Sequence, residues 1–278
     1  MVTIKNNEFS QLSKFIYEQC GINLTPAKKT MVSTRLQKRF RKLNMSTMKD
    51  YLAFLFSAEG KKYEIVHLLD IISTNKTDFF REPAHFQYLR QTVLPEFTSH
   101  SNFSSASPFR VWSAGCSTGE EPYSLAMELQ EYAKENRSLR FSILATDIST
   151  RVLKIAVKAI YSEEKIQPVP ALYKKQYLMR SKDRTQKLVR IVPELRKTVQ
   201  FRRLNFMERD FGIKNPFHAV FCRNVIIYFD RPTQERLINR FANHMVQGAY
   251  LFVGHSETLN GLDVPFRQVY PTVYKKIS

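Results

Sequence analysis

The sequence predicts an α/β fold in which a doubly wound, mainly parallel sheet carries a small antiparallel insertion and follows an all-α domain. Two observations lead to this prediction. After residue 108, short β-rich runs alternate with helical ones, which is typical of crossover units in a parallel sheet. Before residue 96, apolar residues recur at helical spacing. With 43% hydrophobic and 13% aromatic residues, the 278-residue chain can bury real cores, which excludes natural disorder.

The first part of the chain, residues 1–95, is expected to form the helical domain. The segment 96–108 that follows is rich in serine, which is typical of a linker. The helices expected in the first domain contain residues 9–16, 33–43, 51–56 and 63–72.

The second part, residues 109–278, is expected to hold the parallel sheet. The segment 172–203 interrupts the alternation of strands and helices. Side chains alternate between apolar and polar within it, as at 187–192, which favours a small antiparallel unit. The predicted strands are 109–114, 141–145, 218–222, 249–253 and 272–276, and the predicted helices are 120–134, 150–160 and 231–245.

The net charge of +18 suggests an acidic partner, which could be a nucleic acid, an anionic membrane or an acidic protein. The charge is unevenly distributed, because residues 1–95 carry +7 and residues 172–203 carry +9. The segments 96–171 and 204–278 carry only −1 and +3. A neutral chemical core flanked by basic docking surfaces fits this distribution, although charged runs are also common as plain solvated faces.

Cysteine usage and hydropathy point to the cytoplasm. Cys20, Cys116 and Cys222 have no short spacing, which fits neither a disulfide framework nor a thiolate zinc cluster, so we expect no metal. Residues 1–12 lack an apolar signal core, and no run approaches the roughly 18 apolar residues of a membrane span. We therefore expect a soluble, cytoplasmic protein that is a monomer and does not insert into membranes.

The first predicted strand ends in a turn, residues 113–124, that opens directly into a helix. Ligands of doubly wound sheets bind at the carboxyl ends of the strands, and Gly115 and Gly119 would let a ligand approach the backbone. Neither the dinucleotide fingerprint nor the P-loop pattern is complete, which disfavours diphosphate ligands. Glu120 and Glu121 at the helix start suit a ligand with positive charge or hydroxyl groups, or they merely complement the helix dipole.

Polar residues also follow two other predicted strands. Asp147 comes after the second strand and is placed to accept hydrogen bonds from ribose hydroxyls, or to cap the next helix. Arg223 and Asn224 follow the strand at 218–222 and face the same crevice, and Tyr228 lies a few residues beyond. The tetrapeptide Asn-Pro-Pro-Tyr, expected of enzymes that methylate exocyclic base nitrogens, is missing here.

Five short motifs occur in order along almost the whole chain. Each is weak alone, but five at compatible spacing are highly specific, and together they closely resemble the CheR family of chemotaxis receptor glutamate methyltransferases. The motifs are T-N-x-T-x-F-F-R-E at 74–82, S-T-G-E-E-P-Y-S at 117–124, A-T-D-I at 145–148, F-C-R-N-V-x-I-Y-F-D at 221–230 and G-H-S-E at 254–257.

The resemblance implies a seven-stranded methyltransferase sheet, the inserted β-subdomain, and S-adenosyl-L-methionine as methyl donor with S-adenosyl-L-homocysteine as product. It also implies roles for ten residues. Arg81 and Tyr228 would lie near the transferred methyl group as catalytic residues. The cofactor contacts would be Asn75, Thr77 and Arg81 at the methionine end, Glu121 near the first loop, Asp147 at the ribose, Asn205 and Phe206 at the adenine, and Arg223 and Asn224 closing the pocket.

The implied reaction is an in-line displacement in which a receptor carboxylate attacks the methyl group of a sulfonium. A glutamate with a pKa of about 4.3 is already ionised at pH 7, so no general base is needed. The site must instead align the reacting atoms and exclude water. Arg81 would hold the carboxylate, and Tyr228 would hydrogen-bond it or fix Arg81.

The resemblance gives the basic segments candidate roles. Residues 26–49 contain eight Lys or Arg and no acid, so we expect this segment to dock on the glutamate-bearing helices of receptors. In some family members the β-subdomain binds a receptor C-terminal peptide by strand addition, which stays open for this chain.

Two rival functions belong to other classes. A nucleic-acid methyltransferase or binding protein would need aromatic stacking platforms within the basic segments, and these are not evident, so we expect no nucleic-acid partner. A non-catalytic interaction module is disfavoured because Arg81, Glu121, Asp147 and Tyr228 are all present.

Overall fold

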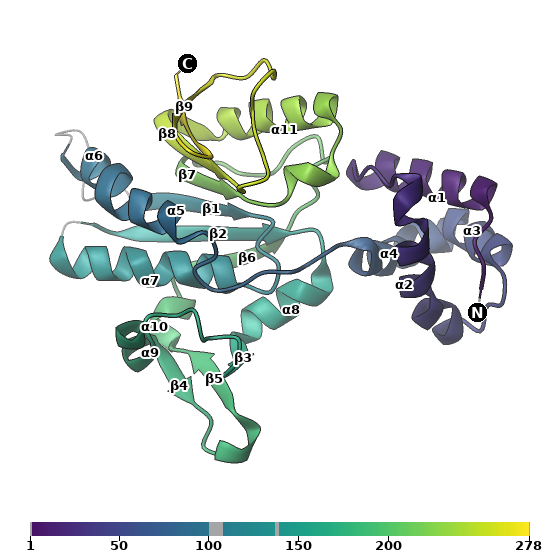
Figure 1. Ribbon diagram of the computed structural model, residues 1–278, viewed down its shortest axis with the longest axis horizontal. Coiled ribbons are helices and arrows are strands. Elements are labelled where there is room, and N and C mark those ends of the chain that lie inside the picture. The colour runs from purple at the N-terminus through teal and green to yellow at the C-terminus, as the bar shows by residue number, and fades with distance from the viewer. Residues whose placement is uncertain (1, 100–107, 137–138, 278) are drawn as a thin grey trace.

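The computed structural model describes residues 2–99, 108–136 and 139–277. It has a group of N-terminal helices, a central seven-stranded sheet and a small three-stranded sheet (Figure 1). Most of the expected linker, residues 100–107, lies outside the described residues. Among the helices of the described residues, none has the length and apolar character needed to cross a bilayer.

The N-terminal helices lie where the sequence predicts them. Gly21 ends the first helix with a φ of 72°, a left-handed conformation that glycine adopts without strain. Apolar faces of all four helices form one core, in which Leu12, Leu36 and Leu55 are fully buried. The helices are α1 Asn6–Cys20, α2 Lys29–Lys42, α3 Met48–Phe56 and α4 Ile65–Ile72, with η1 Pro26–Lys28 and η2 Gly60–Glu64 between them.

Two arginines of the basic segment 26–49 hold this domain together. The Nε atom of Arg39 donates to the buried carboxylate of Glu64 at 2.8 Å. The guanidinium of Arg35 donates to backbone carbonyls at the end of α4, including that of Ile72 at 2.9 Å. A buried ion pair resists separation because either partner alone would be an uncompensated charge. These two charges are therefore structural.

The central sheet has the strand order β6-β2-β1-β7-β8-β10-β9, which confirms the expected seven-stranded, mainly parallel sheet. Among the described strands of this sheet, β10 alone is reversed, since it pairs antiparallel with both of its neighbours, β8 and β9. The strand β9 was not predicted. The strands are β1 Phe109–Ala114, β2 Phe141–Asp147, β6 Val199–Arg203, β7 Phe217–Cys222, β8 Met245–Val253, β9 Phe266–Tyr270 and β10 Val273–Lys276, and the connecting helices are α7 Glu120–Glu135, α8 Thr150–Lys158 and α11 Arg231–Asn243, with η5 Ile226–Tyr228 after β7.

Each face of the central sheet has its own core. Val111 and Phe221 lie on the face that packs against α7, whereas Trp112 and Val220 lie on the face that packs against α11. Figure 1 shows these two helices on opposite sides of the sheet. Because both faces are covered, the carboxyl ends of the strands are the natural place for a ligand.

The packing differs from the predicted domain boundary at residue 95. Three short helical segments, α5 Pro83–Tyr88, η3 Leu89–Val93 and α6 Leu94–Ser99, add buried side chains to the core of the sheet. The core of the N-terminal helices, by contrast, ends at Ile72. Helical periodicity shows which face of a helix is buried, but it does not show which layer covers that face.

The small antiparallel insertion is confirmed, but its bounds differ from the predicted 172–203. Its strands, in the order β3-β5-β4, begin at Ile160, and residues 199–203 form β6 of the central sheet, parallel to β2. The stretch 160–196 carries nine basic and four acidic residues, so part of the predicted charge belongs to the central sheet. The insertion contains β3 Ile160–Ser162, α9 Ala171–Tyr177, β4 Leu178–Arg180, η4 Arg184–Gln186, β5 Leu188–Ile191 and α10 Pro193–Arg196.

Candidate active site

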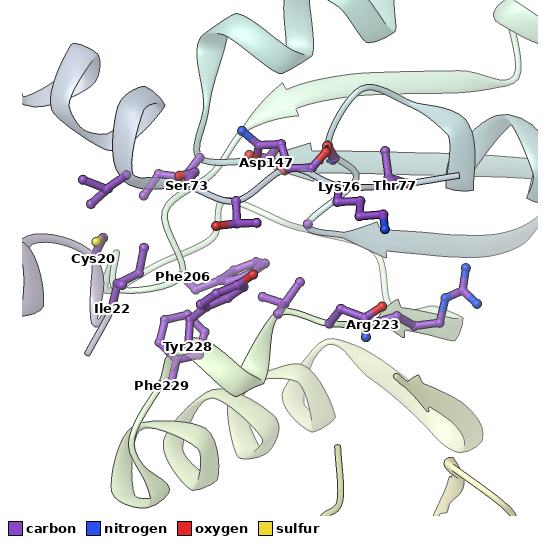
Figure 2. A pocket seen from close by; sticks show the side chains of 18 of the residues that line it. Cys20, Ile22, Ser73, Lys76, Thr77, Asp147, Phe206, Arg223, Tyr228 and Phe229 are labelled. Atoms are coloured by element: carbon purple, nitrogen blue, oxygen red, sulfur yellow. Dashed lines mark hydrogen bonds between the residues drawn. The ribbon is translucent and has the colours of Figure 1, made fainter. Parts of the chain in front are cut away.

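A pocket lies at the carboxyl ends of β1, β2 and β7, and the N-terminal helices complete its wall. Figure 2 shows Arg223 at one end of this pocket and Cys20 and Ile22 at the other. The structure brings all ten predicted site residues to it. They are Asn75, Thr77, Arg81, Glu121, Asp147, Asn205, Phe206, Arg223, Asn224 and Tyr228.

The turn after β1 approaches the loop after β7 closely, and glycine makes this possible. Gly115 has a φ of 92°, and its backbone N–H donates to the carbonyl of Thr146 at 2.8 Å. A Cβ atom at this position would lie 2.4 Å from Cγ2 of Val225, which is well inside van der Waals contact. Gly115 therefore lets the turn after β1 pack directly against Val225, and this close packing shapes the wall of the pocket at this point.

Asp147 ends β2 with its carboxylate buried against the turn. One carboxylate oxygen accepts from the backbone N–H of Ser117 and the other from that of Ser149, both at 2.9 Å. Burial raises the pKa of Asp147, and these hydrogen bonds oppose the rise. The cap of α8 is the hydroxyl of Ser149, which accepts from Val152, so Asp147 is not the helix cap. Each of its oxygens keeps a lone pair for a hydroxyl donor.

Glu121 and Arg223 form a buried ion pair at one end of the pocket. The Nε atom of Arg223 donates to Glu121 at 2.6 Å, and the hydroxyl of Ser113 donates to the other oxygen of Glu121 at 2.6 Å. The Nη1 atom of Arg223 donates to the backbone carbonyl of Arg81 at 2.5 Å. Arg223 thus joins α7 to the segment that carries Arg81, and its charge is balanced by Glu121.

Three residues beside this ion pair could hold a metal ion, namely Glu82, His85 and His255. One potential ligand atom from each lies within 4.8 Å of those from the other two. The guanidinium of Arg223, however, lies 3.5 Å from a carboxylate oxygen of Glu82. It also lies 3.4 Å from Nδ1 of His85. Burial lowers the pKa of His85 to about 3, so its ring is neutral at pH 7. Arg223 and the more distant Arg81, whose Nε atom lies 4.0 Å from Glu82, therefore supply the positive charge beside this cluster.

Arg81 and Tyr228 differ from Arg223 in being partly open to solvent. The side chain of Arg81 is 35% exposed, and its Nη1 atom donates to the carbonyl of Lys76 at 3.3 Å. Tyr228 is half-buried in η5, with the ammonium group of Lys28 5.3 Å from its ring centroid. Both side chains can therefore meet a group that enters the pocket from solvent.

The segment that contains Asn75 and Thr77 is tied to the rest of the pocket through its backbone. The hydroxyl of Ser117 donates to the carbonyl of Asn75 at 2.9 Å, and Lys165 of the insertion donates to the carbonyl of Thr77 at 2.8 Å. The Nδ2 atom of Asn75 is buried and has no hydrogen-bond partner within the protein. A buried donor without a partner costs about 1–3 kcal/mol, so this atom points to an acceptor on a ligand.

Asn205 and Phe206 form the wall after β6. The ring of Phe206 is buried, with its centroid 6.4 Å from that of Trp112 in an edge-to-face contact. Asn205 donates through its side-chain amide to the carbonyl of Gln19 at 2.6 Å, which links this wall to α1. Phe206 thus gives this wall an apolar surface, and Asn205 anchors the wall to α1.

Sequence reasoning missed the contribution of the N-terminal helices to the pocket. The hydroxyl of Tyr17 donates to Asp230 at 2.7 Å, and the N–H of Asn23 donates to the carbonyl of Tyr228 at 2.8 Å. No local pattern marks a contact between residues some 200 positions apart. The pocket residues from the N-terminal helices and the segments that join them are Cys20, Ile22, Leu24, Lys28, Met31 and Ile72.

Sequence reasoning also gave Glu257 no role beyond its motif. This buried carboxylate accepts four backbone N–H groups. Burial raises the pKa of Glu257, and the four hydrogen bonds oppose the rise. Glu257 therefore fixes the loop after β7, and the G-H-S-E motif at 254–257 was the signal that could have revealed it. The donors are Gly254 at 2.6 Å, Asn224 at 2.7 Å, Val225 at 2.8 Å and Ile227 at 3.2 Å.

Comparison with known proteins gives matches over nearly the whole chain. The family model for the all-alpha domain of CheR methyltransferases matches residues 7–73, and the model for their SAM-binding domain matches residues 75–275. The chemotaxis protein methyltransferase of Borreliella burgdorferi is 40% identical over 99% of this chain and 96% of its own length. Chemotaxis protein methyltransferase 2 of Pseudomonas aeruginosa is 37% identical, covering 96% and 92%. The chemotaxis protein methyltransferase of Escherichia coli is 36% identical, covering 98% and 92%.

Proposed function

The chain belongs to the CheR methyltransferase family, and we propose that it methylates glutamate side chains of chemotaxis receptors, with S-adenosylmethionine as donor and S-adenosylhomocysteine as product. Relatives named as chemotaxis protein methyltransferases support methylation in chemotaxis. The glutamate and the receptor are the finer part of the proposal. The observation that carries the donor assignment is the wall formed by Gly115, the Asp147 carboxylate and the unpartnered amide of Asn75.

The residues of this wall fit the donor group by group. Asp147 keeps lone pairs that suit ribose hydroxyls, and Nδ2 of Asn75 suits a carboxylate of the methionine part. The apolar side of Phe206 suits the adenine. Glu121, whose carboxylate is balanced by Arg223, lines the pocket beside them. When bound, the donor supplies a methyl group that its positive sulfonium activates.

Arg81 is the proposed anchor for the incoming carboxylate. Its guanidinium has five N–H donors, and it donates to the carbonyl of Lys76 while its side chain stays 35% exposed. Arg223 is nearly fully buried and held by Glu121 at 2.6 Å, whereas Arg81 makes a longer, 4.0 Å contact with Glu82, so Arg81 is better suited to this role. The hydroxyl of Tyr228 lies in the same pocket and would donate a second hydrogen bond. Both residues would align an already ionised carboxylate, so neither has to remove a proton.

The test is transfer of radiolabelled methyl groups to receptor-containing membranes, followed by alkaline release of the label. We expect base-labile label, because glutamate methyl esters hydrolyse in alkali. Label that resists alkali would overturn the glutamate assignment.

Two substitutions separate the proposed roles. Arg81→Ala should lower methyl transfer at least 100-fold at saturating donor, while Asp147→Asn should weaken binding of S-adenosylhomocysteine about 10-fold or more. Arg267→Ala, at an exposed arginine of β9 outside the pocket, is the matched control and should change neither quantity. Near wild-type transfer by the Arg81→Ala protein would remove Arg81 from the catalytic role.

The docking of receptor helices on the segment 26–49 is also proposed. Because Arg35 and Arg39 have structural partners, the proposal rests on the exposed Lys38 and Arg41 instead. Both outer strands of the inserted sheet, β3 and β4, have a free edge that could accept a peptide strand. The cytoplasmic location and the monomeric state stay predictions.

A further inference from the structure

Exposed apolar side chains lie along the second half of α8 and just beyond its end. Ile155 is 38% exposed, Val157 is 56% exposed, and Ile160, just beyond the helix, is 40% exposed. The buried face of the same helix is formed by Val152 and Leu153. Ile155 lies on the opposite, exposed face, whereas Val157, two residues further on, lies on a different flank of the helix.

Basic residues lie beside Ile155 on the exposed face of α8. Arg151, Lys154 and Lys158 are exposed and recur every three or four residues, so they lie along one face of α8 together with Ile155. The helix contains no acidic residue. The Nε atom of Arg190 donates to the carbonyl of Lys158 at 3.2 Å and carries the row of positive charges onto β5. We call Arg151, Lys154, Lys158 and Arg190, with Ile155, the α8 strip.

The α8 strip is continuous with the candidate active site. A groove between α2, α4 and α8 shares Arg151 with the strip, and it shares Ser73 and Asn75 with the active-site pocket. Asp70 is the acidic residue of this groove, and it accepts hydrogen bonds from Thr150 and Arg151. Figure 1 shows α8 between the N-terminal helices and the three-stranded sheet. The basic residues that line the groove are Arg35, Lys38, Arg39, Arg41, His67 and Arg151.

We propose that the α8 strip is a second receptor-docking surface, which takes an acidic amphipathic helix of the receptor and guides its glutamate from the groove into the pocket towards Arg81. This inference rests on the proposed function, since it needs a receptor as substrate. The nine residues of α8 span about 13 Å, roughly two and a half turns of a partner helix. Acidic side chains of that helix would pair with the lysines, and its apolar side chains would cover Ile155.

A protein helix suits the α8 strip better than the other acidic partners do. A single-stranded nucleic acid would need aromatic side chains for stacking, and α8 has none. A membrane-surface helix needs one whole apolar face free to enter the lipid, but Val152, Leu153 and Ala156 of α8 are buried within the protein. An isoleucine beside lysines, in contrast, suits a partner helix that carries both acidic and apolar side chains.

The test is charge reversal by the double substitution Lys154→Glu with Lys158→Glu. We expect the KM for a soluble receptor cytoplasmic fragment to rise at least 5-fold at low salt, with kcat and the affinity for S-adenosylhomocysteine unchanged. Arg209→Glu with Lys214→Glu is the matched control. It changes the net charge by the same amount at two exposed positions outside the pocket and the groove, and should leave the KM within 2-fold. Ile155→Ser tests the apolar contact and should raise the KM at high salt as well.

The outcomes separate this inference from the proposed function. An unchanged KM in the α8 variants, with normal receptor methylation by the wild type, would overturn the docking surface alone. Loss of binding to protein-free vesicles of anionic lipid, with an unchanged KM for the fragment, would also overturn it by identifying a lipid surface. Failure of the wild type to methylate any receptor fragment would instead overturn the proposed function.

Discussion

Replacing Glu257 by glutamine is expected to loosen the loop after β7. Each oxygen of the Glu257 carboxylate accepts two backbone N–H groups of this loop and its neighbourhood, at 2.6 to 3.2 Å. Glutamine keeps one oxygen but turns its NH₂ group towards two of these donors. The side chain is 5% exposed, so water does not replace the lost acceptor.

The expected magnitude follows from these contacts. A hydrogen bond to a charged group contributes about 1.5–3 kcal/mol, and two are lost, so Glu257→Gln should lower the free energy of unfolding by about 3 kcal/mol. The loop also carries Arg223 and Asn224 into the pocket. If half of this loss in free energy appears as disorder of the loop in the folded protein, ligand binding must restore the order of the loop. The affinity for S-adenosylhomocysteine then falls about 10-fold.

Urea unfolding and calorimetric titration with S-adenosylhomocysteine measure the two effects. Glu235→Gln is the matched control, because Glu235 accepts a single backbone N–H, that of Asp263 at 2.9 Å, near the surface. The control should lose less than about 1 kcal/mol and bind normally. Equal stability losses in the two variants, with unchanged binding in both, would refute the reasoning that Glu257 organises the loop.

Two further substitutions test the pocket and its surroundings. Gly115→Ala should weaken S-adenosylhomocysteine binding at least 10-fold and lower the thermal midpoint more than Gly248→Ala does. Both glycines have positive φ, but a Cβ at Gly115 meets Val225 at 2.4 Å, whereas a Cβ at Gly248 lies 3.7 Å from Cε of Lys275. Equal effects in the two variants would contradict this. Burial lowers the pKa of His85 from 6.5 to about 3, so its folded form stays neutral while the unfolded chain takes up a proton. Stability from this group is therefore lost as the pH falls from 6.5 towards 3, and the free energy of unfolding of the wild type should fall faster than that of His85→Gln by about 1.4 kcal/mol per pH unit. Parallel pH profiles from urea unfolding at pH 7, 6 and 5 would rule this out.

The candidate site was largely predictable because its polar residues follow strand ends. Asp147 and Arg223 each come directly after an apolar run, and parallel strands bring such positions together at one edge of a sheet. The partner of Arg223 could not be read from the sequence, since Glu121 is 102 positions away. The same holds for the wall formed by Cys20 and Ile22, which depends on how two domains pack.

The fold was predictable where the period of the sequence identified a single element. The strand at 109–114 and the helix at 120–134 are examples, because each has one clear apolar pattern. Residues 199–203 show why the rest was not predictable. A short strand has the same local pattern in either sheet, and only its pairing with β2 assigns it to the central one.

The hydrogen bonds of Tyr17 and Asn23 to the loop after β7 mean that the sheet is not a separable enzyme. A fragment that begins after residue 73 would keep every strand of the central sheet, yet its pocket would be open on one side. The backbone of Tyr228 would lose its support from Asn23 at the same time. The N-terminal helices thus take part in forming the pocket, so damage to them should slow turnover as well as weaken the proposed docking of the receptor.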